Sequence, residues 1–183
     1  MTLDQRIRWL LKPAVFVAAL LPFVWLAWRT ITDDLGTNPI ETLNRYTGDW
    51  TLRFLLITLA VTPLRKLTGW HWLMRLRRML GLFVFFYAGL HFFTYAGVDQ
   101  SFDLSAILAD IVKRPYITVG LAALLLLLPL AITSTRGWMR RLGSRWHRLH
   151  RLIYPAAILG CVHFWWQVKA DWREPLVYAS VLA

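Results

Sequence analysis

Two histidines lie inside apolar stretches long enough to cross a membrane, and they are the residues of this sequence best suited to chemistry. His91 lies in MLGLFVFFYAGLHFFTYAG and His163 lies in LIYPAAILGCVHFWW. Hydrocarbon contains no water to solvate an imidazole, so each ring needs a partner inside the protein. A neutral ring nitrogen is a common metal ligand. We therefore expect a metal to be the partner.

The two histidines are predicted to lie at the same depth in the membrane. His91 follows Arg78 by 13 residues and His163 follows Arg151 by 12 residues, which places both about 18–20 Å from the basic ends of their helices. Two imidazoles at one depth can supply both axial ligands of a haem. The alternative is a pair of core histidines hydrogen-bonded to carbonyl groups. Cys161 is the only cysteine, which excludes the C-x-x-C-H motif of covalent attachment and makes any haem b-type.

His150 is a third candidate, 13 residues before His163, or about 20 Å along the same helix. This offset suits a second haem or an entry site for electrons. In an ideal helix the two side chains point about 140° apart, and the position where a partner histidine is expected holds Arg78. His150 is left with several alternatives: ligation alone, ligation with His147 or His71, contact with a flavin or quinone head group, or solvation at the interface.

Basic side chains near these histidines are candidates for binding haem propionates or a flavin phosphate. Their alternative role is to set membrane topology. His147 is three residues before His150 and lies on the same helical face, so these two cannot sandwich one haem. The additional candidates are His147, Arg77, Arg78, Arg148 and Arg151.

The composition is that of a membrane protein with several spans. Of the 183 residues 57% are hydrophobic and the mean hydropathy is +0.46, which exceeds the usual range of a soluble domain of this size. The net charge of +11 does not indicate nucleic-acid binding, because the basic residues form short clusters between long apolar runs. We expect a chain embedded in lipid with no nucleic-acid partner.

The apolar runs predict an all-α bundle of five complete transmembrane helices and a truncated sixth, which form a single domain over residues 1–183. A polar loop is expected at 35–50, and the spacing of Leu104, Ile107, Leu108 and Ile111 predicts a short interfacial helix within 99–113. Pro63 is expected to end the second helix, and Pro129 to kink the fourth. The predicted helices cover about 13–31, 50–64, 79–97, 115–135, 150–168 and, in part, 175–183.

The distribution of charge predicts the orientation. Of the 21 Lys and Arg residues, 14 fall on the side that holds the N-terminus, and nine of the ten acidic residues, all except Asp4, fall on the other. The positive-inside rule makes the basic side cytoplasmic. We expect a bacterial inner (plasma) membrane protein whose N-terminus is cytoplasmic.

Several segments together resemble the MsrQ (YedZ) family, the haem-binding membrane subunits of the bacterial periplasmic methionine sulfoxide reductase system, within the ferric-reductase-like transmembrane group. The resemblance covers nearly the whole chain, and His91, His150 and His163 stand at the three histidines of the family. The segments are LGTNPIETLNRYTGDWTL, RRMLGLFVFFYAGLHFFTY, KRPYITVG and TSTRGWMRRLGSRWHRLHRLIYPAAILGCVHFWW.

The resemblance implies electron transfer from the quinone pool or a cytoplasmic flavin reductase, across haem b with FMN as a further cofactor, to a periplasmic molybdenum-cofactor reductase, MsrP. The sequence contains no nucleotide-binding fingerprint or nucleophile constellation, so we identify no substrate chemistry of its own. Two alternatives are a free-standing ferric or oxygen reductase of the cytochrome b type and a haem-free membrane scaffold.

Overall fold

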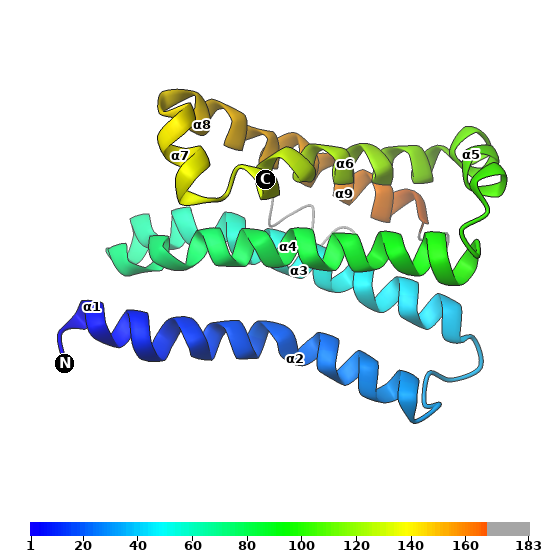
Figure 1. Cartoon of the computed structure of the whole chain (residues 1–183), viewed down its shortest axis with the longest axis horizontal. Coiled ribbons are helices and arrows are strands. Elements are labelled where there is room, and N and C mark those ends of the chain that lie inside the picture. Colours follow the sequence, from blue (N-terminus) through cyan, green and yellow to red (C-terminus); the bar gives the residue numbers. More distant parts are fainter. Residues whose placement is uncertain (168–183) are drawn as a thin grey trace.

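The computed structural model describes residues 1–167, which are helical with no β-strand among them. The long helices run along one axis of the molecule (Figure 1). One hairpin is formed by α3 (Pro39–Thr68) and α4 (Met74–Phe93), and a second by α6 (Pro115–Ile132) and α9 (Ile153–Gln167). These two pairs make the most extensive contacts of the bundle. Helix α2 lies against the first hairpin, on the side away from the second (Figure 1).

The first long helix agrees with its prediction. Helix α2 spans Lys12–Ile31, and α1 (Leu3–Arg6) with a π-helical turn (Ile7–Leu11) extends it toward the N-terminus. Helix α2 contains Pro22, which has no N–H to donate to the preceding turn.

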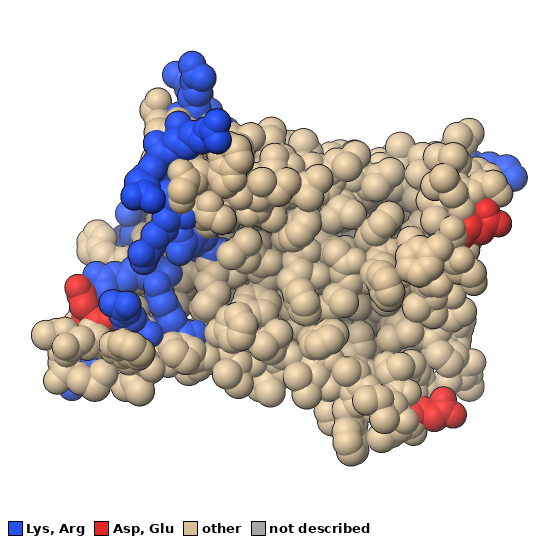
Figure 2. Space-filling model, viewed as in Figure 1, with Lys and Arg blue, Asp and Glu red and all other residues tan. Residues whose placement is uncertain are grey.

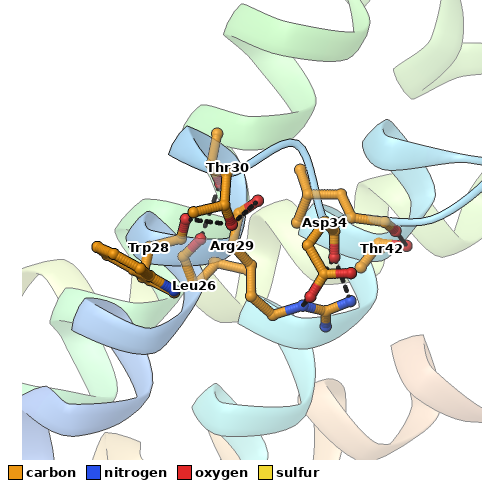
Figure 3. A network of polar contacts seen from close by, with 8 residues as sticks. Leu26, Trp28, Arg29, Thr30, Asp34 and Thr42 are labelled. Carbon is orange, nitrogen blue, oxygen red and sulfur yellow. Dashed lines mark hydrogen bonds and ion pairs between the residues drawn. The ribbon is translucent and has the colours of Figure 1, made fainter.

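A polar network closes the turn after α2 (Figure 3). The Arg29 guanidinium donates to the Asp34 carbonyl at 2.8 Å and to its carboxylate at 3.3 Å. The Thr42 hydroxyl donates to the Leu35 carbonyl at 2.9 Å, which ties the turn to the next helix. The exposed pair is of the kind that contributes little to stability, and it lies where the chain reverses direction.

Helix α3 spans Pro39–Thr68 and contradicts the prediction of a polar loop at 35–50. The Asn-Pro pair within this predicted loop is instead a helix start. The Asn38 side chain accepts the Glu41 N–H at 3.3 Å, and Pro39 takes the first helical position, where a missing N–H is harmless.

The predicted end of this helix at Pro63 is also wrong. The helix continues through Pro63 to Thr68 and is capped by Gly69, whose φ of 73° is the left-handed conformation that favours glycine. A proline removes one backbone donor, and packing against α4 keeps the helix intact across it.

Helix α4 spans Met74–Phe93 and follows a short 3-10 turn at 71–73. It begins five residues before the predicted start, and the helical run continues as a π-helical segment at Thr94–Asp99. Helix α5 (Leu104–Lys113) confirms the predicted short helix. Its N-cap, Asp103, accepts the N–H groups of Ala106 and Ser105, and these bonds lower the pKa of that carboxyl.

The second hairpin begins with α6, which spans Pro115–Ile132 and ends three residues before the predicted boundary. The basic segment after it, predicted as a loop, forms two short helices, α7 (Arg136–Leu142) and α8 (Ser144–Leu149). A 3-10 turn at His150–Leu152 leads into α9 (Ile153–Gln167). Residue 168 and the predicted partial helix at 175–183 lie outside the described residues.

Within residues 1–167 three helical stretches are long and apolar enough to cross a membrane: Leu3–Ile31, His71–Asp99 and Pro115–Ile132. Their outward faces carry large exposed apolar side chains, among them Leu21 and Leu125. Such apolar faces suit contact with lipid hydrocarbon. The helices also satisfy their own backbone hydrogen bonds, as lipid requires. The predicted total of five complete spans stays a prediction.

The ends of the bundle differ in charge. Most Lys and Arg side chains in view gather at the end that holds the N-terminus, α7 and α8, and most acidic ones lie at the opposite end, beside α5 and the turn after α2 (Figure 2). One acidic group stands among the basic ones, and one basic group lies at the acidic end (Figure 2). The surface between the two ends is almost free of charge in this view (Figure 2). This is the pattern expected of a bundle that crosses a bilayer along its long axis.

Tyr87 joins α2 to α4 and is 1% exposed. Its hydroxyl donates to the Ala19 carbonyl at 2.8 Å and accepts the Phe23 N–H at 3.1 Å. These two backbone groups would pair with each other in an undisturbed helix, so the hydroxyl is inserted into the hydrogen-bond ladder beside Pro22. The ring also stacks on Phe54 of α3, with centroids 5.2 Å apart.

We predict that Tyr87→Phe lowers the free energy of unfolding by about 1–3 kcal/mol, because both buried backbone groups lose a partner. Equilibrium unfolding of the detergent-solubilised protein measures this. Tyr154→Phe, at an exposed tyrosine, is the control. Equal stability of the two variants would show that the ladder closes without the hydroxyl.

Candidate metal centre

The structure brings His91 and His163 together at one end of the two hairpins. Their ring centroids lie 5.9 Å apart and their planes are inclined by 71°. His91 belongs to the last turn of α4 and His163 to the last turns of α9. The site therefore lies at the ends of α4 and α9 that are far from the basic side of the bundle. The similar spacing of His91 from Arg78 and of His163 from Arg151 predicted this.

His91 is held against α3 by its Nδ1 atom. Nδ1 lies 2.9 Å from the Asn44 carbonyl oxygen and 3.3 Å from the Thr47 hydroxyl oxygen. A carbonyl can only accept, and the Thr47 hydroxyl already donates to the Leu43 carbonyl at 2.8 Å. Nδ1 must therefore carry the proton.

His163 is held against α6 in the same way. Its Nδ1 lies 2.7 Å from the Tyr116 carbonyl oxygen, which again requires the proton on Nδ1. Both side chains are partly buried. The hydrogen bonds found for the two rings among residues 1–167 all involve Nδ1, so Nε2 of each neutral ring keeps its lone pair.

This arrangement fits a metal held between two imidazoles. A ligating histidine almost always donates its other ring N–H to a carbonyl or carboxylate, which fixes the tautomer and raises the basicity of the ligand. Two rings that bind one metal from opposite sides, with bonds of about 2 Å, have centroids roughly 6 Å apart. The alternative of satisfied core histidines accounts for Nδ1 and gives no role to Nε2 in two adjacent rings.

No group of three or more His, Cys, Asp or Glu side chains that could hold a metal ion occurs in the described part of the chain. Among residues 1–167, a metal at this site would therefore have the two imidazoles as its ligands. Haem suits such a pair, because the porphyrin itself supplies the four equatorial ligands and leaves two axial positions for the protein.

His150 lies at the opposite end of α6. Its Nε2 is 3.1 Å from the Thr133 hydroxyl, which itself donates to the Pro129 carbonyl at 2.6 Å. The hydroxyl oxygen thus accepts from His150, which places the proton on Nε2. Trp146 covers the ring, with centroids 3.8 Å apart, and its indole N–H donates to the Thr133 carbonyl at 2.9 Å.

The two kinds of histidine therefore differ in tautomer. His91 and His163 keep Nε2 available, whereas His150 uses Nε2 to hold Thr133 and has one face stacked on Trp146. Thr133 and Tyr116 are 17 residues apart along the chain, or about 25 Å along the helix. His150 thus belongs to a separate site, at the basic end of the bundle.

The other predicted site residues gather at this basic end. Arg77 donates to the Thr62 hydroxyl at 2.9 Å, and Arg78 points to the Met139 sulfur at 3.6 Å. His147 is exposed and meets Trp146 edge-on at 5.2 Å between centroids. Arg148 and Arg151 are also exposed. None of these side chains is near the His91–His163 pair in the hydrogen bonds and ring contacts of the described residues.

Sequence reasoning missed the groups that hold the rings. Asn44 and Thr47 lay in the segment interpreted as a loop, and Tyr116 was taken only as part of an apolar helix. Two of these groups act through backbone carbonyls, which every residue possesses. No side-chain pattern could have identified them.

Comparison with known proteins now identifies the class. Residues 47–161, more than half of the chain, match the family model described as the ferric reductase like transmembrane component. The matched range contains His91 and His150 and ends just before His163.

Curated relatives narrow the assignment. The heme-binding subunit MsrQ of protein-methionine-sulfoxide reductase from Herminiimonas arsenicoxydans is 57% identical over 95% of this chain and 81% of its own length. The subunit of the same name from Rhodospirillum rubrum is 61% identical over 92% of this chain and 82% of its own. The chain belongs to the MsrQ family, as its sequence motifs predicted.

Proposed function

We propose that this protein carries electrons across the bacterial inner membrane through a b-type haem that His91 and His163 would hold. The observation that carries the proposal is the pair of imidazoles 5.9 Å apart, each with Nδ1 on a helix carbonyl. The relatives named as heme-binding subunits support the choice of haem over another metal. Bound haem would supply a one-electron carrier.

The protein's own contribution at this site is to fix two neutral ligands in a low-dielectric environment. The carbonyls of Asn44 and Tyr116 keep the proton on Nδ1 of each ring, so Nε2 faces no competition from a proton. Two helices bring one ligand each, so the hairpins must pack together before both bonds can form.

We propose that the reductant is on the basic, cytoplasmic side and the oxidant on the acidic, periplasmic side. The asymmetry of charge between the two ends supports this orientation. His91 and His163 lie at the acidic end, near the point of exit. The acceptor is a periplasmic MsrP-type reductase, and the donor is quinol or a cytoplasmic flavin reductase, with FMN as a further carrier.

The electron count constrains the cycle. Reduction of a methionine sulfoxide to a thioether consumes two electrons and two protons and releases one water. Quinol and reduced flavin each release two electrons. A one-electron carrier held at this site would therefore have to turn over twice for each sulfoxide. Proton uptake then belongs to the periplasmic partner, where water is released.

His150 is proposed as an entry-side group and not as a ligand of a second haem. Its Nε2–H is engaged by Thr133 and one ring face is covered by Trp146. The arginines at the same end, Arg77 and Arg78 among them, suit the anionic groups of a flavin or haem propionates. A quinone or flavin ring next to His150 would meet an aromatic surface and cationic side chains.

We predict that His91→Ala and His163→Ala each abolish the same b-type absorbance, because each variant removes one of two axial bonds. Loss of a group that only supports a metal ligand lowers metal affinity by about 10-fold or more. Loss of the ligand itself should therefore lower haem affinity by more than about 10-fold. Reduced-minus-oxidised spectra of purified protein measure it. A full haem content in either variant would refute the assignment, and a haem-free wild-type protein would refute the function.

We also predict that His150→Ala slows reduction of the haem by the cytoplasmic donor several-fold and leaves its oxidation by the periplasmic partner unchanged. The reason is that His150 lies at the basic end, about 25 Å along α6 from the level of Tyr116. Stopped-flow absorbance of the two half-reactions separates the effects. His71→Ala, an exposed histidine at the same end, is the control. If His150→Ala slowed oxidation of the haem and left its reduction normal, the entry-side role of His150 would be contradicted.

A further inference from the structure

Each of the paired histidines rests on a helix carbonyl that lies four residues before a glycine. The ring of His91 contacts the Asn44 carbonyl, and Gly48 follows Asn44 by one helical turn. The ring of His163 contacts the Tyr116 carbonyl, and Gly120 follows Tyr116 by one turn.

A helix carbonyl has two lone pairs, one of which is used by the N–H four residues later. The second lone pair of the carbonyl of residue i is reached from the side of the helix, next to residue i+4. Side chains of a helix lean back toward its N-terminus, so a Cβ on residue i+4 leans over the carbonyl of residue i. In both hairpins the imidazole approaches the carbonyl on the side where this Cβ would lie.

The distances show how tight the fit is. A Cβ built on Gly120 would lie 2.7 Å from Nδ1 and 2.9 Å from Cε1 of His163. A Cβ built on Gly48 would lie 3.3 Å from Cε1 and 3.4 Å from Nδ1 of His91. The first contact is impossible unless the ring moves, and the second requires a shift of a few tenths of an ångström.

Backbone conformation does not explain these glycines. The glycines with positive φ are Gly36, Gly69 and Gly143 in the described part of the chain, so Gly48 and Gly120 have ordinary helical dihedrals that any residue adopts. Glycine is a poor helix former, and both lie in helix interiors. What these positions require is space for the ring.

The same arrangement occurs twice in the chain. Each carbonyl precedes its histidine by 47 residues. Asn44, Gly48 and His91 of the first hairpin correspond to Tyr116, Gly120 and His163 of the second, at a constant offset of 72 residues. In each hairpin the first helix offers a carbonyl and a glycine, and the antiparallel partner helix offers the imidazole.

We infer that Gly48 and Gly120 are positioning residues for the two axial ligands, each of which lets an imidazole bind a helix carbonyl and thereby sets the direction and basicity of Nε2. The inference rests on the proposed haem ligation and adds to it two residues that touch no metal. It makes each hairpin a ligand unit of three parts: carbonyl, glycine and histidine.

Because the two contacts differ in tightness, the two glycines should differ in effect. Gly120→Ala must displace the His163 ring from the Tyr116 carbonyl. Haem affinity should fall about 10–100-fold, the usual effect of losing a group that orients a metal ligand. Gly48→Ala should act in the same direction and more weakly. Any haem retained should have a more positive midpoint potential, since an imidazole without its carbonyl partner donates less to ferric iron.

The test uses the full chain, purified in detergent from haem-replete bacteria, with wild type, Gly120→Ala, Gly48→Ala and Gly89→Ala compared. Gly89 is the matched control, because it lies in α4 two residues before His91 and a Cβ there would meet nothing within 4 Å. Haem per protein, the midpoint potential and the electron paramagnetic resonance spectrum of the ferric form are measured. Size-exclusion profiles establish that each variant is folded.

The expected result is normal haem content for Gly89→Ala, a partial loss or a raised potential for Gly48→Ala, and the largest loss for Gly120→Ala. If Gly120→Ala does not fold, Gly48→Ala decides. A haem-loaded wild type with glycine variants of unchanged content, potential and spectrum would overturn this inference alone. A wild type that binds no haem would overturn the proposed function as well.

Discussion

The hydrogen bond between a histidine Nδ1 and a helix carbonyl is the interaction on which the proposed site depends. Lipid offers no water to an imidazole, so a histidine within a span needs an acceptor from a neighbouring helix. Here the acceptors are the carbonyls of Asn44 and Tyr116, at 2.9 and 2.7 Å. Each bond joins the two helices of one hairpin. The same bond orients the ring and leaves Nε2 unprotonated, as the proposed iron ligation requires.

The rest of the bundle keeps these bonds in place. Helices α3 and α4 pack through stacked aromatic side chains such as Phe54 and Tyr87, and α9 approaches its neighbours through the buried Ala156 and Ala157. Small residues at helix contacts allow the backbones to come close, as is common in membranes. The histidines therefore meet because the two hairpins pack together, which makes the geometry a property of helix packing.

Much of this could be predicted from the sequence, because membranes restrict the choices. Apolar runs of sufficient length must be helical, and counting residues from Arg78 and Arg151 was enough to place His91 and His163 at one level. The prediction failed where polar residues were taken for a loop. Asn38, Pro39 and Glu41 are a helix start, and Thr47, about two turns further on, is buried against His91. The segment is polar, as its composition shows, but its backbone is helical from Pro39 onward and does not form a loop.

The environment of His150 could not be predicted, for a different reason. Its partners, Thr133 and Trp146, come from α6 and α8, and the tautomer follows from the fact that the Thr133 hydroxyl already donates to Pro129. Such a chain of donors and acceptors exists only after folding. In contrast, an isolated glycine inside an apolar helix is a visible signal that close packing is required, although its partner is not visible.

The central claim is that His91 and His163 would hold the proposed haem iron as two neutral imidazoles. Near-infrared magnetic circular dichroism of the oxidised, purified protein tests this directly, since the energy of the ligand-to-iron charge-transfer band depends on the axial pair. The account predicts one low-spin species with the band of bis-imidazole ligation. A high-spin ferric spectrum, or a low-spin band at the position of a thioether or thiolate ligand, would contradict it.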